Sequence, residues 1–210
     1  MAREPGASFR NNVSRIDLTT GAVSDLFNFV PADLGLSPSS NLSLEGISID
    51  PSNPAVATIL ATSLIEGFLF DLDLNTGVIS GRVLLSIPIA TDLARASDGT
   101  FYVSSAASFR RIGRIDRATG VVTQTGSCTS CTMRAMNFDP SGALFEIDAA
   151  GVLARISTTA QTLQTLGPTG LGFVPPGAAV FGMAFVVPEP STALLLALGL
   201  AALAIRRRAS

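Results

Sequence analysis

Residues Ala107–Gly120 read ASFRRIGRIDRATG, and residues Ala7–Gly21 read ASFRNNVSRIDLTTG, so one pattern occurs twice, a hundred residues apart. With one gap the two copies share Ala-Ser-Phe-Arg, Arg-Ile-Asp and Thr-Gly. A third copy, FLFDLDLNTG, lies at Phe68–Gly77. A weaker fourth copy, VLARISTTAQ, lies at Val152–Gln161 and lacks the turn glycine. Internal repetition on this scale is typical of proteins built from one repeated structural unit.

Each copy predicts a strand, a Thr-Gly or Thr-Ala turn, and a second strand. Glycine at the turn supplies a positive φ without steric cost. Apolar residues alternate with polar ones on both sides of the turn, as expected for a half-buried hairpin. The predicted second strands begin at residues 22, 78, 121 and 162.

A second element alternates with these hairpins. It appears as Gly46–Pro51, Leu93–Gly99 and Met136–Pro140, and each copy runs through an Asp-Pro or Asp-Gly turn into another strand. The turn aspartates are Asp50, Asp98 and Asp139, which lie 48 and 41 residues apart. A unit of this length with four short strands predicts one propeller blade.

We therefore expect an all-β body of about four propeller-like, four-stranded blades, the first of them incomplete. A single sheet cannot bury both of its faces, so neighbouring blades must stack. A β-sandwich with similar hairpins is the alternative fold. The pattern over Ala7–Phe185 resembles the propeller-like repeats of bacterial secreted proteins. We assign residues 1–186 to this domain and residues 187–210 to a separate tail.

The tail reads VPEPSTALLLALGLAALAIRRRAS from Val187 to Ser210. An uncharged run rich in Leu and Ala follows Pro188-Glu189-Pro190, and Arg206-Arg207-Arg208 closes it. Leu and Ala favour helix, and proline is tolerated in the first helical turn. A helix from Pro190 to Ile205 would be roughly 24 Å long, slightly short of a hydrocarbon core of about 30 Å. We predict a single C-terminal transmembrane helix, with a buried core helix as the alternative. The arginines favour a cytoplasmic C-terminus, which leaves the body extracytoplasmic.

The order Pro-Glu-Pro, short apolar helix, arginine cluster and chain end resembles the PEP-CTERM sorting signal of bacterial exported proteins. The resemblance implies an exosortase-type transpeptidase that recognises Pro188, Glu189 and Pro190. It also implies a transient stay in the inner membrane, followed by release to the cell surface or the medium. A Gram-negative host that makes extracellular polymer is implied as well.

The amino-acid composition limits the kinds of catalytic site, metal site and partner that the body can have. The chain has no histidine, which removes Ser-His-Asp and Cys-His nucleophile systems and histidine metal sites. Its net charge is −2 and no basic stripe precedes the tail, so no nucleic-acid partner is indicated. We expect no cofactor. The only cysteines, Cys128 and Cys131, form a C-T-S-C spacing. In an exported chain this spacing favours a small loop disulfide, with free thiols or a redox pair as alternatives.

Two carboxylate patterns have competing explanations. Asp71, Asp73 and Asn75 suggest a calcium loop, but the glycine is one place late and Arg82 stands where a bidentate glutamate would bind. The hairpin repeat explains this run better. The turn aspartates at 50, 98 and 139 suggest catalytic carboxylates, but aspartates commonly accept hydrogen bonds from the backbone of their own turns.

We expect a non-enzymatic surface or matrix protein. The alternatives are a binding module for a glycan or extracellular polysaccharide and, less favoured, a propeller lyase or hydrolase. We also expect that Met1 is not the natural start, because Ala7 enters a blade at its third strand and Met1–Arg15 has no signal-peptide core. Gly182–Phe185 resembles Gly46–Ile49 and could supply one of the missing strands.

Overall fold

The computed structural model describes residues 11–17, 19–37, 41–63, 65–88, 90–105, 111–127, 133–148, 151–158 and 162–168. This part of the chain is built almost entirely from β-strands. A single turn of 3-10 helix, Pro31–Leu34, follows the second strand and ends at Gly35, whose φ of 67° is left-handed. The predicted all-β body is confirmed for these residues.

The strands form four antiparallel sheets, and each sheet takes consecutive strands in chain order. The two-stranded sheet, called the first hairpin, pairs β1 (Asn12–Ile16) with β2 (Val23–Asn28). Blade 2 contains β3 (Ser43–Asp50), β4 (Asn53–Thr62), β5 (Gly67–Asp73) and β6 (Ile79–Leu84). Blade 3 contains β7 (Asp92–Arg95), β8 (Phe101–Ser105), β9 (Arg111–Ile115) and β10 (Val122–Ser127). Blade 4 contains β11 (Met133–Phe138), β12 (Leu144–Asp148), β13 (Val152–Ile156) and β14 (Leu163–Pro168).

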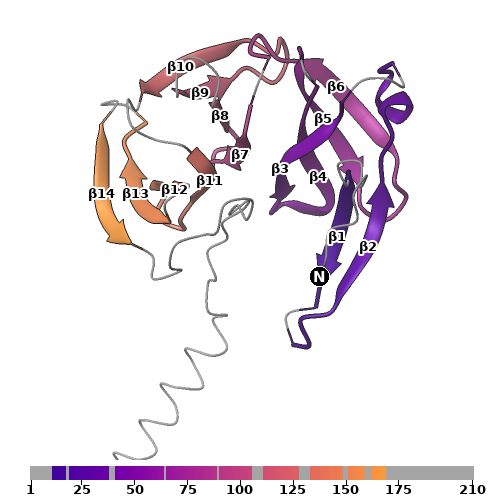
Figure 1. Ribbon diagram of the computed structural model, residues 1–210, viewed down its shortest axis with the longest axis horizontal. Coiled ribbons are helices and arrows are strands. Elements are labelled where there is room, and N and C mark those ends of the chain that lie inside the picture. The colour runs from indigo at the N-terminus through magenta and orange to yellow at the C-terminus, as the bar shows by residue number, and fades with distance from the viewer. Residues whose placement is uncertain are drawn as a thin grey trace, which may run out of the picture.

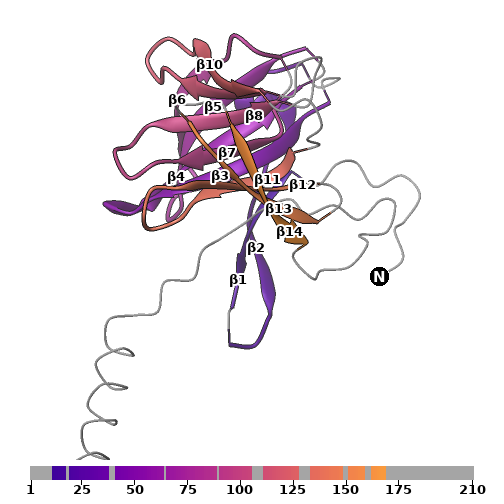
Figure 2. The same cartoon turned by 90° about the vertical axis from the view of Figure 1, so that its left-hand side faces the viewer.

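The blades stand side by side along an arc, with the first hairpin beyond blade 2 (Figure 1). The first strand of each blade faces the inside of the arc, and β3 contacts β7 as β7 contacts β11. The last strands, β6, β10 and β14, lie on the outer side. Figure 2 shows the first hairpin extending past the edge of the blades. Four-stranded meanders stacked in this way resemble propeller blades.

The apolar cores lie between neighbouring sheets. Phe29 of the segment after β2 packs against blade 2 with Ile59 and Phe70. The opposite face of blade 2 meets blade 3 through Leu60 and Val103, and further clusters repeat this pattern between blades 3 and 4. In β5, Phe68, Leu69 and Phe70 are all fully buried, because this strand is covered on both faces. If one face of this sheet were exposed to solvent, buried and exposed residues would alternate along β5.

The repeated hairpin turns have one shared geometry. The Oδ1 atoms of Asp17, Asp73 and Asp116 each accept hydrogen bonds from the backbone N–H groups two and three residues later. The glycine after each threonine has a φ between 70° and 76° and donates its N–H to the carbonyl of the same aspartate. The predicted glycine at positive φ is therefore confirmed at all three copies that contain it. The fourth copy also forms a strand pair, β13 with β14.

The structure corrects the alignment of the second element. Arg95 pairs with Phe101, and Phe138 pairs with Leu144. Ala96 therefore stands where blade 4 has Asp139, and Asp98 lies two residues farther along its turn. The two connections have the same length, residues 96–100 and 139–143, but the aspartate is the third residue of the first and the first residue of the second. The spacing of 48 and 41 residues therefore misaligned Asp98.

Several expectations concern residues outside the described ranges. These are the tail with its predicted transmembrane helix, Cys128 and Cys131, and the segment Gly182–Phe185. Within the described ranges, no helix is long and apolar enough to cross a membrane. Among the described residues, the first hairpin is a sheet of two strands, β1 and β2.

Candidate functional site

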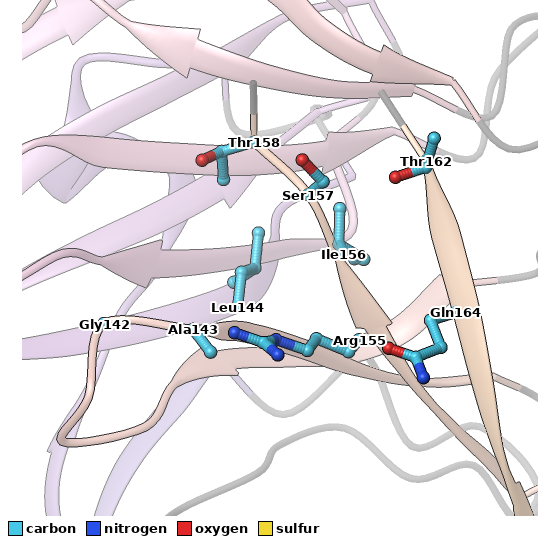
Figure 3. Close-up of a pocket in the computed structure, with 9 residues that line it drawn as sticks. All are labelled: Gly142, Ala143, Leu144, Arg155, Ile156, Ser157, Thr158, Thr162 and Gln164. Carbon is cyan, nitrogen blue, oxygen red and sulfur yellow. The ribbon is translucent and has the colours of Figure 1, made fainter. Parts of the chain in front are cut away.

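A concave site of about 380 Å³ lies at the rim of blade 4, where β13 and β14 leave their shared turn. Register places Arg155 of β13 directly opposite Gln164 of β14 and beside Phe145 of β12. Ser157 directly follows β13 and lies two residues after Arg155, and its N–H donates to the Thr162 carbonyl, so the pairing of the two segments continues past the strand end. Figure 3 shows Arg155 and Gln164 on adjacent strands, with the hydroxyls of Ser157 and Thr162 just beyond the ends of these two strands.

The lining of this site combines one cation, neutral polar groups and an apolar base. Leu144 and Ile156 are buried in the core between blades 3 and 4, and they supply the apolar part of the lining. Thr158 and Thr162 add hydroxyl groups at the turn end. No carboxylate lines the site in the described part of the chain. The guanidinium of Arg155 therefore faces a concave surface on which it is the sole charge.

The carboxylate of Asp139 interacts electrostatically with Arg155. Arg155 acts on Asp139, whose pKa is lowered mainly by the Ser141 hydroxyl, then by the Ala143 N–H, and least by the charge of Arg155. Asp139 Oδ1 accepts hydrogen bonds from the N–H and Oγ of Ser141 and from the N–H of Ala143, at 2.7–2.9 Å. That carboxylate is occupied by its own turn, and Arg155 remains available to a ligand.

The turn aspartates do not gather into a catalytic group. Asp50 Oδ1 accepts hydrogen bonds from the hydroxyl and N–H of Ser52, which together with Arg95 lower the pKa of Asp50 to about 2. Arg95 pairs with Asp50 at 2.9 Å and so links blade 3 to blade 2. Asp98 accepts the N–H of Thr100. Each of these carboxylates stabilises its own turn, as the sequence suggested.

The alternative calcium loop at Asp71, Asp73 and Asn75 is not assembled either. Asp73 accepts hydrogen bonds from the backbone N–H groups of Asn75 and Thr76, which lower its pKa. Asp71 instead accepts the Thr58 hydroxyl and pairs with Arg117 of blade 3 at 3.0 Å. Within the described ranges, no three Asp, Glu, Cys or His residues lie close enough to hold a metal ion.

Two buried carboxyl groups were not anticipated from the sequence. Asp92 at the start of β7 is 5% exposed, and burial raises its pKa to about 7. Its Oδ1 accepts the N–H of Leu93, and its Oδ2 accepts the N–H of Met136 on β11. The negative charge of Glu45 on β3 adds a smaller upward contribution to the pKa of Asp92.

Glu146 on β12 is the second such group. It is 1% exposed, its Oε2 has no hydrogen-bond partner, and burial raises its pKa to about 7, with a smaller contribution from Asp148. Glu146 pairs with Met136 on the first strand of blade 4. It holds the position that Val103 holds in blade 3 and Ile59 holds in blade 2. A charged residue inside the apolar run Leu144–Ile147 was a usable signal, but only once the blades were aligned position by position.

The candidate sorting residues Pro188, Glu189, Pro190 and Arg206–Arg208 lie outside the described ranges, as do Cys128 and Cys131. A family model for the PEP-CTERM protein-sorting motif matches residues 186–208. The chain thus carries this motif at the predicted place. The motif indicates an exported protein with a C-terminal membrane-anchoring signal that is sorted by exosortase.

Solved structures share the fold of the body at low identity. A gluconolactonase from Xanthomonas campestris is 14% identical, with a TM-score of 0.56, over 85% of this chain and 60% of that one. A luciferin-regenerating enzyme is 16% identical, with a TM-score of 0.54, over 86% and 61%. The allergen Mala s 1 of Malassezia sympodialis is 11% identical, with a TM-score of 0.52, over 77% and 60%.

The chain therefore spans about three fifths of the length of these structures. At such identities the likeness concerns the fold alone. A comparison with curated protein sequences gives no match.

Proposed function

We propose that this chain is an exported, non-enzymatic protein of the cell surface or extracellular matrix. Its tail holds it in the inner membrane until an exosortase-type transpeptidase processes it at Pro188-Glu189-Pro190. The body then remains at the surface or is released. The sorting motif at residues 186–208 is the observation that carries this proposal.

The chemistry of the body supports a non-enzymatic role. The chain has no histidine, and the turn aspartates are used by their own backbones. Asp92 and Glu146 have the raised pKa values that general acids and bases often show, but neither lines the concave site of blade 4. Their raised pKa values follow from burial between strands, and a core position accounts for both.

Processing can be tested with two epitope tags in a host that encodes an exosortase. One tag follows Ser210, and the other is inserted at Ile65, which is 78% exposed in the β4–β5 connection. We expect the mature protein outside the inner membrane to keep the Ile65 tag and lose the C-terminal tag. Replacing Pro188, Glu189 and Pro190 with alanine, or deleting the exosortase gene, should leave both tags in the inner membrane.

The matched control is Glu66→Ala, a glutamate replacement within the body. It should be processed like the wild type. A protein that reaches the surface with both tags, or that is processed equally without exosortase, would contradict the proposal.

The concave site of blade 4 supports a second candidate function, the binding of an anionic sugar unit. Arg155 supplies a guanidinium suited to a carboxylate, and Gln164, Ser157 and Thr162 supply groups suited to sugar hydroxyls. A volume of about 380 Å³ falls at the small end of the range for ligand sites. A galacturonate oligosaccharide is the appropriate probe, with a neutral glucose oligosaccharide for comparison.

Calorimetry on the full chain in detergent tests this candidate. We expect binding of the galacturonate probe that Arg155→Ala abolishes, and that Arg15→Ala on the first hairpin leaves unchanged. Equal binding by Arg155→Ala, or equal binding of the neutral probe, would remove blade 4 as the site. This result is independent of whether the tail is processed.

A further inference from the structure

Two buried carboxyl groups lie in the layer between blades 3 and 4, one from each blade. Asp92 and Ala94 are two residues apart on β7 and share a face, and Ala94 belongs to the apolar core between these blades. The Oδ2 atom of Asp92 also accepts the N–H of Met136 on β11. Glu146 and Leu144 share a face of β12 in the same way, and Leu144 belongs to that core. Asp92 therefore points toward blade 4, and Glu146 points toward blade 3.

The core between blades 2 and 3 has glycine or apolar residues where the core between blades 3 and 4 has polar ones. Three pairs of residues hold equivalent register positions: Gly46 and Asp92, Leu60 and Ser104, and Val103 and Glu146. Ser104 is fully buried, and its hydroxyl shares a hydrogen bond of 2.9 Å with the hydroxyl of Thr91. Blades 3 and 4 therefore have less apolar contact at these positions than blades 2 and 3.

Ion pairs between described side chains strengthen the contact of blade 2 with blade 3. They measure 2.9 and 3.0 Å and are Asp50 with Arg95 and Asp71 with Arg117. The equivalent positions between blades 3 and 4 hold no pair of opposite charges; they are Ala96 with Phe138 and Arg114 with Thr158. In the described part of the chain, blade 4 is therefore held to blade 3 without an ion pair of this kind.

Ionisation of the two buried carboxyl groups is opposed by burial and by neighbouring charges of the same sign. Asp92 is 5% exposed and Glu146 is 1% exposed, and burial raises the pKa of each to about 7. The negative charge of Glu45 on β3 adds to this effect at Asp92, and that of Asp148 on β12 adds to it at Glu146. The Oε2 atom of Glu146 accepts no hydrogen bond.

The other described groups that face this layer do not supply a neutralising charge. On blade 4, Glu146 lies between its cross-strand partners Met136 and Ala154, which are uncharged. On blade 3, Tyr102 and Arg114 are cross-strand partners on the face toward blade 4. Arg114 is exposed, and its charge acts on the aspartates in the turns of its own blade. It forms no ion pair with either buried carboxyl group.

We propose that blades 3 and 4 form a pH-sensitive hinge, which is closed while Asp92 and Glu146 are protonated and opens when both lose their protons. Two ionised carboxylates in this layer would be buried charges without a cationic partner, which is strongly destabilising. Opening brings water to both groups, while the ion pairs keep blade 2 against blade 3. Because both groups bind protons more tightly in the closed form, closure is most favoured below about pH 4 and weakens as the pH rises from about 4 to 7.

Opening of this hinge would change the concave site of blade 4. Leu144 and Ile156 belong both to the core between blades 3 and 4 and to the lining of that site. Separation of the two blades removes the packing that holds these side chains in place. The hinge depends neither on processing of the tail nor on sugar binding, so each of the three can fail without the others.

Thiol labelling measures the opening of each interface separately. The full chain in detergent carries Cys128→Ser and Cys131→Ser, and one reporter cysteine is added to it. Ala94→Cys reports on the core between blades 3 and 4, and Ala90→Cys reports on the core between blades 2 and 3, because both alanines are 1% exposed. Each maleimide labelling rate is divided by that of the exposed Ile65→Cys at the same pH, which corrects for the effect of pH on thiol reactivity.

We expect the relative labelling rate of Ala94→Cys to rise at least about tenfold from pH 5 to pH 8. The rate of Ala90→Cys should change by less than about twofold, because its interface has no buried carboxyl group of this kind among the described residues. Adding Asp92→Asn together with Glu146→Gln should remove the rise at Ala94→Cys, since neither side chain can then ionise. Glu146→Gln alone should reduce the rise, and it replaces the double substitution if that protein does not fold.

The matched control is Asp25→Asn with Glu66→Gln, which removes two carboxyl groups outside this layer and should keep the full rise. A relative rate of Ala94→Cys that is equal at pH 5 and pH 8 would overturn the proposal. An equal rise at Ala90→Cys would overturn it as well, since the whole body rather than one interface would then open. Ala154→Cys, on the blade 4 side of the same layer, replaces Ala94→Cys if the latter does not fold.

Discussion

The carboxylate of Asp92 on β7 accepts a hydrogen bond from the backbone N–H of Met136 on β11. One buried side chain thereby joins the innermost strands of two blades. The second oxygen of Asp92 accepts the N–H of Leu93 at 2.8 Å. In blade 4 the equivalent position is Ala135, and in blade 2 it is Gly46. At this position, blade 2 contacts blade 3 through the backbone at Gly46, whereas blade 3 contacts blade 4 through the buried carboxylate of Asp92.

Asp92 should make stability depend on pH between about 4 and 7. Its pKa is about 7 in the folded protein, against 3.8 for an ordinary aspartate, so the folded state binds more protons than the unfolded state across this window. The contribution of Asp92 to stability should therefore be greatest below about pH 4, fall as the pH rises from about 4 to 7, and stop changing above about pH 7. One such group gives a slope of at most about 1.4 kcal/mol per pH unit.

Chemical denaturation at pH 5, 6, 7 and 8 measures this slope. Asp92→Asn should reduce it, and should also cost about 1–2 kcal/mol at pH 5, because an amide has one acceptor oxygen for two backbone donors. Asp25→Asn, on the exposed first hairpin, is the control and should keep the wild-type slope. A wild-type slope in Asp92→Asn would assign the pH dependence to other groups.

Glu146 should be a destabilising residue at neutral pH. Its Oε2 is buried without a partner, and the equivalent positions in the other blades are Ile59 and Val103. Glu146→Met removes the unpaired group at similar volume, so we expect a gain of about 1–3 kcal/mol in the free energy of unfolding at pH 8. The gain should shrink at pH 5, where Glu146 is protonated. Glu66→Met, in the β4–β5 connection, serves as the control.

A loss of stability in Glu146→Met that is independent of pH would contradict this account. It would mean that the carboxyl group makes a favourable contact in the folded protein. Glu146→Gln separates the two cases, because it keeps the shape and a hydrogen-bonding group while removing the charge.

The hairpin aspartates should tolerate asparagine better than alanine. Asp73 and Asp116 each accept two backbone N–H groups, at 2.9–3.4 Å, within the same turn geometry. Asparagine keeps an acceptor oxygen at this place, whereas alanine leaves both donors without one. We expect the melting temperature to fall in the order wild type, Asp73→Asn, Asp73→Ala, with the same order at Asp116. An equal loss for both substitutions at Asp73 would mean that its charge, rather than the acceptor atom, matters.

Local turn chemistry explains why much of the body was predictable. Asp17, Asp73 and Asp116 each lie three residues before a threonine that a glycine follows, and each accepts hydrogen bonds from the backbone of its own turn. A local motif of this kind needs no tertiary information. The strand-turn-strand units and their order followed from these turns. Asp98 was misaligned because it is the third residue of its connection, whereas Asp139 is the first residue of the equivalent connection in blade 4.

The candidate site and the buried carboxyl groups depend on contacts between strands. Arg155 and Gln164 become neighbours only through the register of β13 and β14, which a weak, glycine-free copy of the repeat does not specify. Asp92 resembles an ordinary polar residue at the start of a strand, and its burial results from the packing of β11. The sorting motif was recognisable because its parts are contiguous in the sequence.

The last prediction separates two costs of replacing a turn glycine. Gly21 and Gly120 are equivalent, with φ of 70° and 74°, so alanine is strained at both. A Cβ at Gly21 meets nothing within 4 Å, whereas a Cβ at Gly120 would overlap the carbonyl oxygen of Leu84 and lie 2.8 Å from Val83 Cγ1. Gly120 also accepts the N–H of Ser86 at 3.0 Å, so this turn of blade 3 is docked on the segment that follows blade 2.

Gly21→Ala should therefore cost about 1 kcal/mol, the strain of a left-handed alanine alone. Gly120→Ala should cost that amount plus the separation of two blades, about 3 kcal/mol or more in total. Chemical denaturation of both variants at one pH measures the difference. Hydrogen exchange should locate the extra loss at the N–H groups of Ser86 and Val122, which bond across this contact. Equal costs for the two variants would mean that the turn of blade 3 moves away from Leu84 without loss, so that blades 2 and 3 are not held together there.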